Sequence, residues 1–543
     1  MTVQEKATII LSAGVIKNIG PSIGSNQSNG MIPVNGKPVS GWILDDLLQK
    51  QTREVVLVIR QDDYRLRNFV TWAYGQRMVI RFASPAGETI LHSLQAGLEA
   101  SHLNGPVEVL LGDTLIRDSF DADGDFVYTG VVEDARRWCL VKASQEGFVM
   151  EYSEKPVSSA PPQIALAGYY RFRDGDALRV ALDESLAQGE RELSAVLRCY
   201  SKKYPIQARR AREWYDFGHI DNLVDARRSL LQPRFFNSLK VNPVLNTITK
   251  ISRNNDKLQD ELDWYLSLPD DLQALTPRIL QHKNINGELQ IVQEYYGYPT
   301  LAELYVYGGV DAEIWESILR KVMRVHREFG NYCGELSAQE IYDMYIGKTC
   351  ERLEALIRQD GSWNSLFHRP KIEYNRKVLK NIYEILPELV LIVDEISRSG
   401  QIHIIHGDFC FSNILFDVNN QIIRLIDPRG YFGRKGIYGD SRYDIAKLRH
   451  SISGLYDFIV ADMFSIAETA PGVFSGQVFV NGIQEPLERY FDQLLVDQGY
   501  SLKEIRLIEG LLFVSMLPYH QDQPRRQKMF FLTGLSLLNE AIS

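Results

Sequence analysis

One short segment of the sequence combines an aspartate, an asparagine and a second aspartate at a spacing that suits phosphoryl transfer from ATP. Asp408 ends a His-Gly-Asp sequence, Asn413 follows five residues later, and Asp427 ends a Leu-Ile-Asp sequence. An aspartate such as Asp408 can accept the proton of a substrate hydroxyl, while Asn413 and Asp427 can hold Mg²⁺ against the phosphates. A small-molecule kinase needs these groups, because catalysis of phosphoryl transfer consists mostly of positioning and charge neutralisation.

Apolar runs around these residues predict the strands that would position them. Residues 402–405 are mostly isoleucine, which favours a buried strand before the first aspartate. Residues 414–416 and 422–426 are predicted to form the two arms of a hairpin, with polar residues at 417–420 supplying its turn. Asp408 would then lie on a loop and Asp427 at the exit of a strand. The alternative is a hairpin that carries polar residues without a catalytic role.

This segment resembles the aminoglycoside phosphotransferase and choline kinase family, whose fold is similar to that of protein kinases. The family has His-Gly-Asp with an asparagine five residues after the aspartate. The resemblance therefore implies that Asp408 is the catalytic base and that Asn413 and Asp427 are metal ligands.

Residues 439–446 resemble the acidic helix start of the same family. There Asp440 or Asp444 would brace the catalytic loop, or the two would simply cap a helix. Asp440 is also a candidate for contact with the substrate. The sequence departs from the family at Arg429, where an acidic residue is more usual, and this arginine could contact an anionic substrate or face solvent.

The residues before this segment fit the smaller lobe of such a kinase. Residues 238–241 and 246–251 are predicted to be strands. On the second of them Lys250 would contact the ATP phosphates, and Glu261 on a following helix would orient it. The alternative is an exposed lysine and a solvated helix glutamate.

Two further expectations concern the rest of this half of the chain. Residues 289–296 resemble the last strand and hinge of the kinase family, so Glu294 and Tyr296 are candidates for holding adenine through backbone groups. Residues 377–399 have apolar positions at helical spacing, which predicts a helix that Pro387 kinks or splits.

The first third of the chain alternates predicted strands and helices. The strands are expected at residues 7–11, 54–59 and 107–111, and the helices at residues 39–49 and 90–100. This order predicts a mostly parallel, Rossmann-like α/β sheet with right-handed crossovers. Ligands of such sheets bind beyond the carboxyl ends of the strands, where Ser12 and Asp113 are expected to lie.

Two aspartates of this region are candidates for a second Mg²⁺ site. Asp113 directly follows a predicted strand, and Asp216 stands about one hundred residues later in Trp-Tyr-Asp-Phe-Gly. Two aspartates that the fold brings together can bind Mg²⁺, which bridges nucleotide phosphates. Each aspartate by itself could equally be a turn residue.

An ordered set of segments between residues 6 and 230 resembles the sugar-phosphate nucleotidyltransferase family, which includes the glucose-1-phosphate thymidylyltransferases. The resemblance implies a nucleotide site, a metal site and a sugar-phosphate site. The residues that it assigns are Ser12, Ala13, Gly14 and Gly87 to the nucleotide, Asp113 and Asp216 to the metal, and Glu154, Lys155 and Gly168 to the sugar phosphate.

The sequence departs from this family at two cationic positions. Gly14 is followed by Val-Ile-Lys-Asn where the family has a second glycine and an arginine, and Ser28-Asn29 stands where a Pro-Lys pair is usual. The missing cations would neutralise the triphosphate and stabilise the departing pyrophosphate. Lys17 is a candidate substitute. The domain is therefore either an active transferase or a module that binds a nucleotide without catalysis.

Length and composition limit the classes of protein that need to be considered. A chain of 543 residues predicts more than one domain, and 45% hydrophobic with 24% charged residues is typical of a soluble globular protein. The net charge of −9 argues against a general nucleic-acid binder. No apolar run approaches the roughly 20 residues that would span a membrane. Five widely spread cysteines favour a reduced, cytoplasmic setting.

Together these features predict a two-domain enzyme. Residues 1–233 would form the nucleotidyltransferase-like domain. Residues 234–543 would form an α+β, bilobal kinase-like domain, with a small lobe at about 234–300 and a large lobe at about 301–543. The kinase would use ATP and Mg²⁺ to phosphorylate a sugar, polyol or amino alcohol. The transferase would join that phosphate to a second nucleoside triphosphate, CTP or another pyrimidine nucleotide, with release of pyrophosphate.

The product of these two steps would serve surface polysaccharide or similar glycoconjugate synthesis. The expected partners are small substrates and nucleotides, without nucleic acid or membrane insertion, and a homo-oligomer is compatible with the transferase class. One alternative is a small-molecule kinase whose N-terminal domain binds a nucleotide without catalysis. Another is a scaffold in which both domains only bind.

Overall fold

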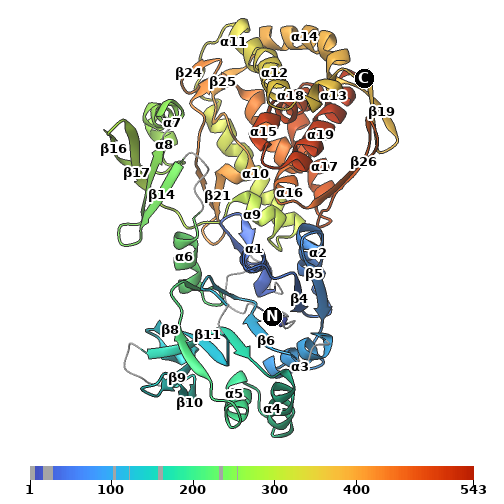
Figure 1. Ribbon diagram of the computed structural model, residues 1–543. Coiled ribbons are helices and arrows are strands. Elements are labelled where there is room, and N and C mark those ends of the chain that lie inside the picture. The colour runs from blue at the N-terminus through green and yellow to red at the C-terminus, as the bar shows by residue number, and fades with distance from the viewer. Residues whose placement is uncertain are drawn as a thin grey trace. The chain divides into compact units, whose positions relative to one another are not determined.

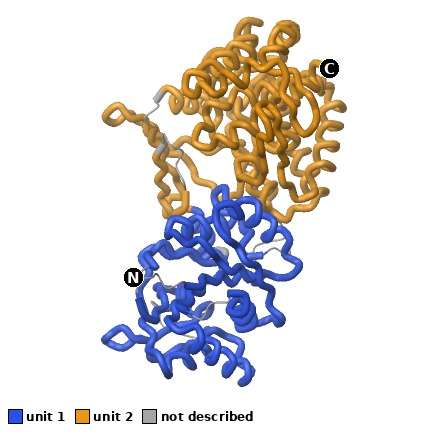
Figure 2. Tube along the Cα trace, turned by 45° about the vertical axis from the view of Figure 1, so that its right-hand side comes forward, with its two compact units in different colours: residues 1–227 blue, residues 228–543 orange. Residues whose placement is uncertain are grey.

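The computed structural model describes residues 6–15, 28–101, 105–120, 123–156, 163–231, 237–252 and 255–543. Lys17 lies outside these residues. The chain divides into two compact units, Met1–Arg227 and Arg228–Ser543, which are coloured separately in Figure 2. In the part of the chain that is described, no helix is both long and apolar enough to cross a membrane.

The first unit is an α/β structure whose elements are labelled in Figure 1. Its strands are β1 (Ala7–Leu11), β2 (Pro33–Val34), β3 (Lys37–Pro38), β4 (Glu54–Val58), β5 (Val79–Ala83), β6 (Val107–Leu111), β7 (Thr114–Ile116), β8 (Phe126–Val132), β9 (Cys139–Ala143), β10 (Val149–Glu154), β11 (Gln163–Phe172), β12 (Gln207–Arg210) and β13 (Trp214–Asp216). Its helices are α1 (Val39–Gln49), α2 (Tyr64–Tyr74), α3 (Ile90–Ser101), α4 (Gly175–Ala187), α5 (Leu193–Ser201), α6 (Ile220–Ser229) and the short 3₁₀ turns η1 (Asn29–Met31) and η2 (Ala135–Arg137).

The main sheet has the strand order β10-β9-β11-β6-β1-β4-β5, with β8 paired to β11 and β12. Strands β6, β1, β4 and β5 are parallel, as the alternation of strands and helices predicts. The expected strands and helices of this region are confirmed to within one residue. The prediction of a mostly parallel sheet is wrong, however, because β11 runs antiparallel to β6, β8 and β9. The sheet is mixed, since these strands follow one another without helical crossovers.

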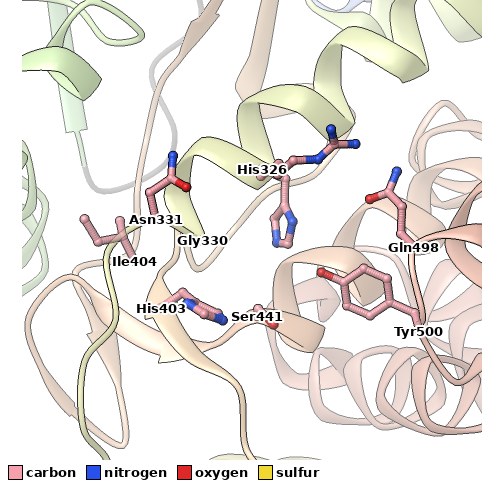
Figure 3. A pocket seen from close by; sticks show the side chains of 9 residues that line it. His326, Gly330, Asn331, His403, Ile404, Ser441, Gln498 and Tyr500 are labelled. Atoms are coloured by element: carbon pink, nitrogen blue, oxygen red, sulfur yellow. The ribbon is translucent and has the colours of Figure 1, made fainter.

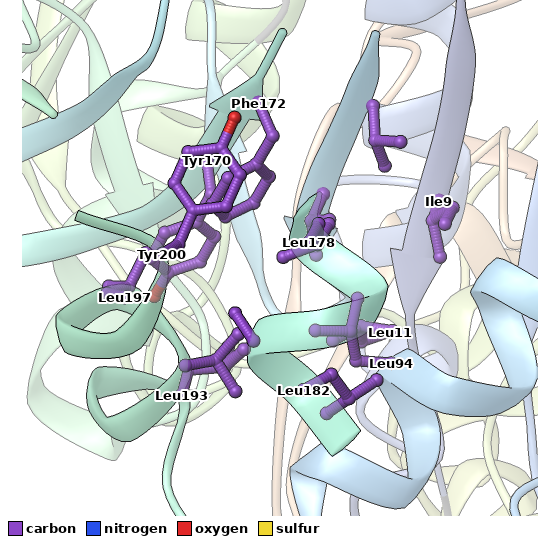
Figure 4. Close-up of a cluster of buried hydrophobic side chains, with 14 of the residues drawn as sticks. Ile9, Leu11, Leu94, Tyr170, Phe172, Leu178, Leu182, Leu193, Leu197 and Tyr200 are labelled. Atoms are coloured by element: carbon purple, nitrogen blue, oxygen red, sulfur yellow. The ribbon is translucent and has the colours of Figure 1, made fainter. Parts of the chain in front are cut away.

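A large apolar core lies between the parallel strands and helices α3, α4 and α5 (Figure 4). Its members include Ile9 of β1, which is fully buried, together with leucines of all three helices. Full burial of one such side chain contributes about 1.5–3 kcal/mol to folding. This packing holds the carboxyl ends of β1 and β6 at a constant position, and those ends carry the loops of the predicted nucleotide site.

The second unit begins with a small sheet and continues as a mainly helical body (Figure 1). Its strands are β14 (Asn237–Asn242), β15 (Thr247–Ser252), β16 (Ile279–Ile285), β17 (Glu288–Glu294), β18 (Lys371–Tyr374), β19 (Lys377–Lys380), β20 (Ile402–Ile404), β21 (Ile414–Asp417), β22 (Ile422–Leu425), β23 (Tyr431–Phe432), β24 (Arg434–Lys435), β25 (Tyr438–Asp440), β26 (Phe464–Ala470) and β27 (Val473–Val478). Its helices are α7 (Asn255–Ser267), α8 (Asp270–Gln273), α9 (Leu301–Val306), α10 (Ala312–Phe329), α11 (Ala338–Tyr342), the π-turn η3 (Asp343–Gly347), α12 (Lys348–Gln359), α13 (Ser362–Phe367), α14 (Ile382–Arg398), η4 (Phe411–Asn413), α15 (Ser441–Ile452), α16 (Tyr456–Val460), α17 (Gln484–Asp497), α18 (Leu502–Ser515), η5 (Leu517–His520) and α19 (Pro524–Ile542).

The small sheet is antiparallel, with the order β14-β15-β17-β16. Helix α7 packs against it through Leu258 and Leu262, which meet Leu289 and Ile291 of β17 in one apolar cluster. The helical body is built around α18, which packs against α15 and α19. The strands predicted at residues 238–241 and 246–251 are confirmed as β14 and β15, and the predicted hairpin is confirmed as β21 and β22.

The predicted helix over residues 377–399 is wrong in its first turn. Residues 377–380 form strand β19, which pairs with β18, and α14 begins only at Ile382. Asn381 separates the two elements, because its side chain caps the helix and its amide donates to the carbonyls of Leu366 and Arg369. Pro387 lies inside α14 near its start.

Candidate functional site

The first unit brings Asp113 and Asp216 to the same place through a pair of short strands. Asp113 directly precedes β7, and β13 pairs antiparallel with β7 so that Asp216 lies opposite Thr114. The backbone N–H of Phe217 also donates to the Asp113 carbonyl at 2.9 Å. The two carboxylates border the same space at Gly218, where an added methyl group would lie 3.0 Å from Asp113 Oδ2 and 3.5 Å from Asp216 Oδ1. A glycine therefore keeps this space open.

Three polar side chains that were not predicted from the sequence hold these carboxylates. Asn29 Nδ2 donates to Asp113 Oδ2 at 2.8 Å. On the other side, Asp216 Oδ2 lies 2.8 Å from His219 Nδ1 and accepts from Asn222 Nδ2 at 2.8 Å. The spacing of His219 and Asn222, three and six residues after Asp216, was the only available signal. Asn29 stood out only as a departure from the family at a cationic position, and its contact with Asp113, 84 positions away, was not predicted.

The carboxylate pair fits a hard cation such as Mg²⁺. Burial, followed by the negative charge of Asp216, raises the pKa of Asp113 to about 6. A cation in the space beside Gly218 would remove this unfavourable charge pairing. Mg²⁺ in proteins commonly takes one or two carboxylates and completes its coordination with water and substrate phosphates. Among the described residues, no group of three or more His, Cys, Asp or Glu side chains is arranged to hold a metal ion.

We expect the raised pKa of Asp113 to make metal binding at this pair sensitive to pH near 6. Below that pH the proton competes with the cation, so apparent affinity should fall about tenfold per pH unit. Mn²⁺ binding in the presence of nucleotide can be measured by electron paramagnetic resonance at pH 5 to 8. The part of the bound signal that disappears in Asp113→Asn is the binding at this carboxylate pair. In Asn29→Leu the midpoint should move upward, because the Asn29 hydrogen bond lowers the pKa of Asp113. A wild-type midpoint near pH 4 would contradict the expectation.

The predicted nucleotide residues at the end of β1 lie close to this pair. Ser12 is buried, and its Oγ has no hydrogen-bond partner among the described residues. A methyl group on Gly112, the neighbour of Asp113, would lie 2.6 Å from Ser12 Oγ. At Gly14 an added methyl group would lie 3.1 Å from Asn29 Nδ2, and Ala13 is half-buried between Ser12 and Gly14. The structure thus brings residues 12–14 to the Asn29 side of the carboxylate pair.

The remaining predicted residues of the first unit are more dispersed. Gly168, at φ +88°, approaches Thr114 Oγ1 so closely that an added methyl group would lie 2.9 Å from it. Gly87 packs on the ring of His92. Glu154 is half-buried beside Cys139, whereas Lys155 is exposed and its Nζ lies 3.4 Å from Glu192 Oε1. Only Gly168 among these four is adjacent to the strand that follows Asp113.

In the second unit, Lys250 lies between two predicted carboxylates. Its Nζ donates to Glu261 Oε1 at 2.6 Å and to Asp427 Oδ1 at 2.5 Å. Burial opposes the ammonium charge, but the carboxylates of Asp427 and Glu261 outweigh it and raise the pKa of Lys250 above its ordinary value. The lysine is therefore charged, and it joins β15, α7 and the loop after β22.

Asp408 and Asn413 form a second contact within the same unit. Asn413 Nδ2 donates to the backbone carbonyl and to Oδ2 of Asp408, both at 2.9 Å. The other side-chain atom, Asn413 Oδ1, is buried and has no hydrogen-bond partner among the described residues. An unpaired buried amide oxygen is costly unless a ligand completes it, so Asn413 fits the role of a cation ligand. Asp427 has φ +57°, a backbone strain that is characteristic of functional loops.

The loop of Asp408 is braced from α15. Asp444 accepts hydrogen bonds from the backbone N–H groups of His406, at 2.7 Å, and Gly407, at 2.9 Å. Burial raises the pKa of Asp444 to about 7. The bracing role that the sequence left open between Asp440 and Asp444 therefore falls to Asp444.

Asp440 has the helix-cap position that the sequence analysis gave as the alternative. It is fully buried, caps α15, and binds the guanidinium of Arg442 at 2.7 Å, while Tyr345 OH donates to it at 3.1 Å. This is the geometry of a structural helix cap with both oxygens engaged inside the protein. Both oxygens of Asp440 are thus used inside the protein, which does not fit the predicted contact with the substrate.

A glycine also allows the chain after Asp427 to pack closely on the helix of Glu261. Gly430 has φ +63°, and an added methyl group would lie 2.0 Å from the backbone oxygen of Asp260. The chain after Asp427 can approach α7 so closely only because this residue lacks a side chain.

The predicted hinge residues interact mainly with their neighbours. Glu294 accepts from Tyr296 OH at 2.7 Å and from the backbone N–H of Arg278 at 3.1 Å. The ring of Tyr296 stacks on Tyr298 with centroids 5.5 Å apart, and the guanidinium of Arg424 lies 5.2 Å from the Tyr296 centroid. These side chains give the end of β17 a defined conformation.

Several cationic residues near Asp408 were missed by sequence reasoning. Lys447 Nζ lies 2.9 Å from Asp408 Oδ1. Lys348 and Arg352 lie on α12, and the charges of Arg352, Lys447 and Arg429 all act on Lys348. A signal existed for Lys447, which stands one helical turn after Asp444. There was none for α12, whose place beside the Asp408 loop depends on the tertiary fold.

A cavity of about 410 Å³ lies elsewhere in the second unit (Figure 3). His326, His403 and Tyr500 point into it, and burial lowers the pKa of His326 to about 4. None of the residues predicted for catalysis or binding lines this cavity. It is a separate feature from the Asp408 loop.

Comparison with known proteins identifies the class of the first unit. Residues 7–233 match the nucleotidyl transferase family. This region is therefore a nucleotidyl transferase domain, in agreement with its mixed sheet. Comparison with curated proteins gives no match.

Similar solved structures cover about two fifths of the chain. They include a protein from Bacillus anthracis assigned as a glucose-1-phosphate thymidylyltransferase, in complex with sucrose (19% identity, 42% of this chain and 97% of that chain, TM-score 0.38). A UDP-glucose pyrophosphorylase with UDP-glucose has 19% identity, covering 41% of this chain and 97% of that chain at TM-score 0.36. A nucleoside-diphosphate-sugar pyrophosphorylase from Vibrio cholerae RC9 has 18% identity, covering 41% and 99% at TM-score 0.36.

Proposed function

We propose that the chain is a bifunctional enzyme that phosphorylates a small hydroxyl compound and then converts the phosphate ester into a nucleotide-activated donor. Residues 234–543 would be the kinase-like domain and residues 1–233 the nucleotidyltransferase. The observation that carries the kinase proposal is the contact of Lys250 with both Glu261 and Asp427. Lys250 thus directly contacts the two carboxylates that were predicted to take part in the same reaction.

In the kinase reaction, Asp408 would accept the proton of the acceptor hydroxyl. Its two oxygens are held by Asn413 and Lys447. Lys250 would neutralise charge on the ATP phosphates, with Glu261 keeping it in place. Asn413 Oδ1 and Asp427 would hold Mg²⁺, which supplies charge neutralisation on the transferred phosphoryl group.

In the transferase reaction, a phosphate oxygen of the first product would attack the α-phosphorus of a nucleoside triphosphate, and pyrophosphate would leave. Residues 12–14 would bind the nucleotide at the end of β1, and Asp113 and Asp216 would hold Mg²⁺. Gly218 leaves the space beside both carboxylates open, and Asn29 orients Asp113. We propose CTP or another pyrimidine nucleotide as the second substrate. The acceptor would be a sugar, polyol or amino alcohol, and the product would serve surface polysaccharide or similar glycoconjugate synthesis in the cytoplasm.

A second candidate is a kinase whose first domain binds a nucleotide without catalysis. The observation that favours it is the hydrogen bond of Asn29 to Asp113, because Asn29 is a neutral amide where the family has a cation. Lys17, the proposed substitute cation, lies outside the described residues and so does not decide between the two.

The decisive experiment supplies the full chain with ATP, Mg²⁺, a series of alcohols and one nucleoside triphosphate at a time. ADP and pyrophosphate are measured separately. Pyrophosphate that depends on ATP, one alcohol and one nucleotide would support the two-step enzyme. ADP without pyrophosphate, even when the phosphorylated acceptor is supplied, would leave the second candidate. If neither product forms with any acceptor, the kinase proposal fails.

A further inference from the structure

Four cationic side chains gather around the loop of Asp408. Lys348 and Arg352 lie one helical turn apart on α12, Arg429 follows the loop of Asp427, and Lys447 lies on α15. Their mutual influence is direct, because the charges of Arg429, Arg352 and Lys447 all act on Lys348. Residues from three separate parts of the sequence thus place positive charge at one point.

Tyr443 of α15 brings two of these cations together. Its hydroxyl lies 3.3 Å from Lys348 Nζ and accepts from Arg429 Nη1 at 2.9 Å. Arg352 is held separately, because its guanidinium donates to the Ser515 carbonyl and to Tyr519 OH, both at 3.0 Å. Lys348, Arg352 and Arg429 are therefore positioned by neutral oxygens, which fix their geometry without cancelling their charge, whereas Lys447 faces Asp408.

Asp408 supplies negative charge near this group. Among the described residues, Lys447 forms a close ion pair with Asp408 at 2.9 Å, and the charge of Asp408 also acts on Lys348. Burial and the neighbouring cations lower the pKa of Lys348 well below its ordinary value. Half-buried like charges repel one another, so the folded protein would be stabilised by an anion at this place.

The arrangement also has the chemistry that recognises oxyanions. A guanidinium can donate two parallel hydrogen bonds to a carboxylate or phosphate, and ammonium groups add charge without a fixed geometry. An acceptor with an ammonium group would meet repulsion from the same residues. The positive charge lies beside Asp408, the proposed base, so the anion and the reacting hydroxyl would belong to one small molecule.

We propose that the acceptor of the kinase reaction is an anionic alcohol, a hydroxyl compound that carries a carboxylate or phosphate ester bound by Lys348, Arg352 and Arg429. The proposal rests on the proposed kinase function of the second unit. The hydroxyl oxygen bonds to the γ-phosphorus of ATP, the bond from that phosphorus to the bridging oxygen breaks, and ADP leaves with its electron pair. The hydroxyl proton passes to Asp408. Simple amino alcohols are thereby excluded from the earlier range of acceptors.

The test compares four probes with the full chain: glycerate, glycerol 3-phosphate, glycerol and ethanolamine. ADP formation should show kcat/KM at least 100-fold higher for one of the anionic probes than for glycerol or ethanolamine. Glycerate and glycerol 3-phosphate separate a carboxylate site from a phosphate site. Equal efficiency for glycerol, or preference for ethanolamine, would overturn the inference while leaving the kinase proposal intact.

Variants then connect the preference to the cations. Arg352→Gln and Arg429→Gln should each raise KM for the preferred anionic acceptor at least tenfold and lower its preference over glycerol. Arg358→Gln is the matched control on the same helix, because Arg358 is exposed and lies 3.6 Å from Glu354. An unchanged preference in both test variants would remove these residues from acceptor recognition.

A binding measurement keeps the inference testable if no probe is phosphorylated. Calorimetric titration with inorganic phosphate and with glycerate should show binding to the wild-type chain that is weakened at least tenfold in Arg352→Gln and Arg429→Gln but not in Arg358→Gln. Such binding without turnover would support the anion site and count against the kinase reaction. Neither binding nor turnover would overturn both.

Discussion

Asp408→Asn is expected to lower the rate of ADP formation by about 10²–10⁴-fold, the range for loss of a general base. The replacement has nearly the same shape, but it cannot accept the hydroxyl proton. It also loses the negative charge that faces Lys447 at 2.9 Å. Initial rates of ADP release with a saturating acceptor would measure the effect, and binding of ATP by calorimetry should be retained.

The control for this change is Asp394→Asn, since Asp394 lies on the surface of α14 in an ion pair with Arg398. It should leave ADP formation within about twofold, because exposed ion pairs of this kind contribute little. If Asp408→Asn kept the full rate with an unchanged melting temperature, Asp408 would not be the base. A combined loss of ATP binding and melting temperature would show instead that the variant is misfolded.

Asp113→Asn is expected to lower pyrophosphate release by more than about 10²-fold while ADP formation continues. The change removes one of the two charges bordering the space at Gly218, and the remaining amide meets the Asn29 amide in place of a carboxylate. The measurement is a coupled pyrophosphate assay with the phosphorylated acceptor supplied directly, so that the kinase step is bypassed.

Asp62→Asn serves as the comparison for this second change, because Asp62 is 76% exposed and belongs to the same unit. Its pyrophosphate release should match that of the wild-type chain. Equal loss of ADP and pyrophosphate in Asp113→Asn would show that the two activities are coupled or that the chain is misfolded. Unchanged pyrophosphate release would remove Asp113 from the metal site.

Local sequence patterns were sufficient for the elements that carry the site. The apolar runs at 7–11 and 107–111 became β1 and β6, and the arms around Asp417 became the β21–β22 hairpin. Such patterns are reliable because strand and helix periodicity is set by neighbouring residues. The same reasoning misassigned residues 377–380, where pairing with β18 favoured a strand over the helix that follows.

The contacts that the site residues make were harder to predict from the sequence. Asn29 contacts Asp113 across 84 positions, and Arg429 acts on Lys348 from a different element. No spacing rule connects residues so far apart, since only the folded chain brings them together. The burial of a side chain also cannot be read from the sequence. In the structure Asp440 is buried as a helix cap, and Asp444 is buried where it accepts a hydrogen bond from the backbone of His406.

The sequence by itself determined the chemical groups of the protein and their order. It supplied Asp408, Asn413 and Asp427 within one short segment, Lys250 on a preceding strand, and Asp113 after the strand that became β6. The tertiary structure decided which groups meet. It placed Lys250 between two carboxylates, opened a space beside Asp113 and Asp216 at Gly218, and gathered positive charge near Asp408. The physical reason is that residue type and local spacing select strands and helices, whereas charge balance and burial arise only from contacts between distant segments.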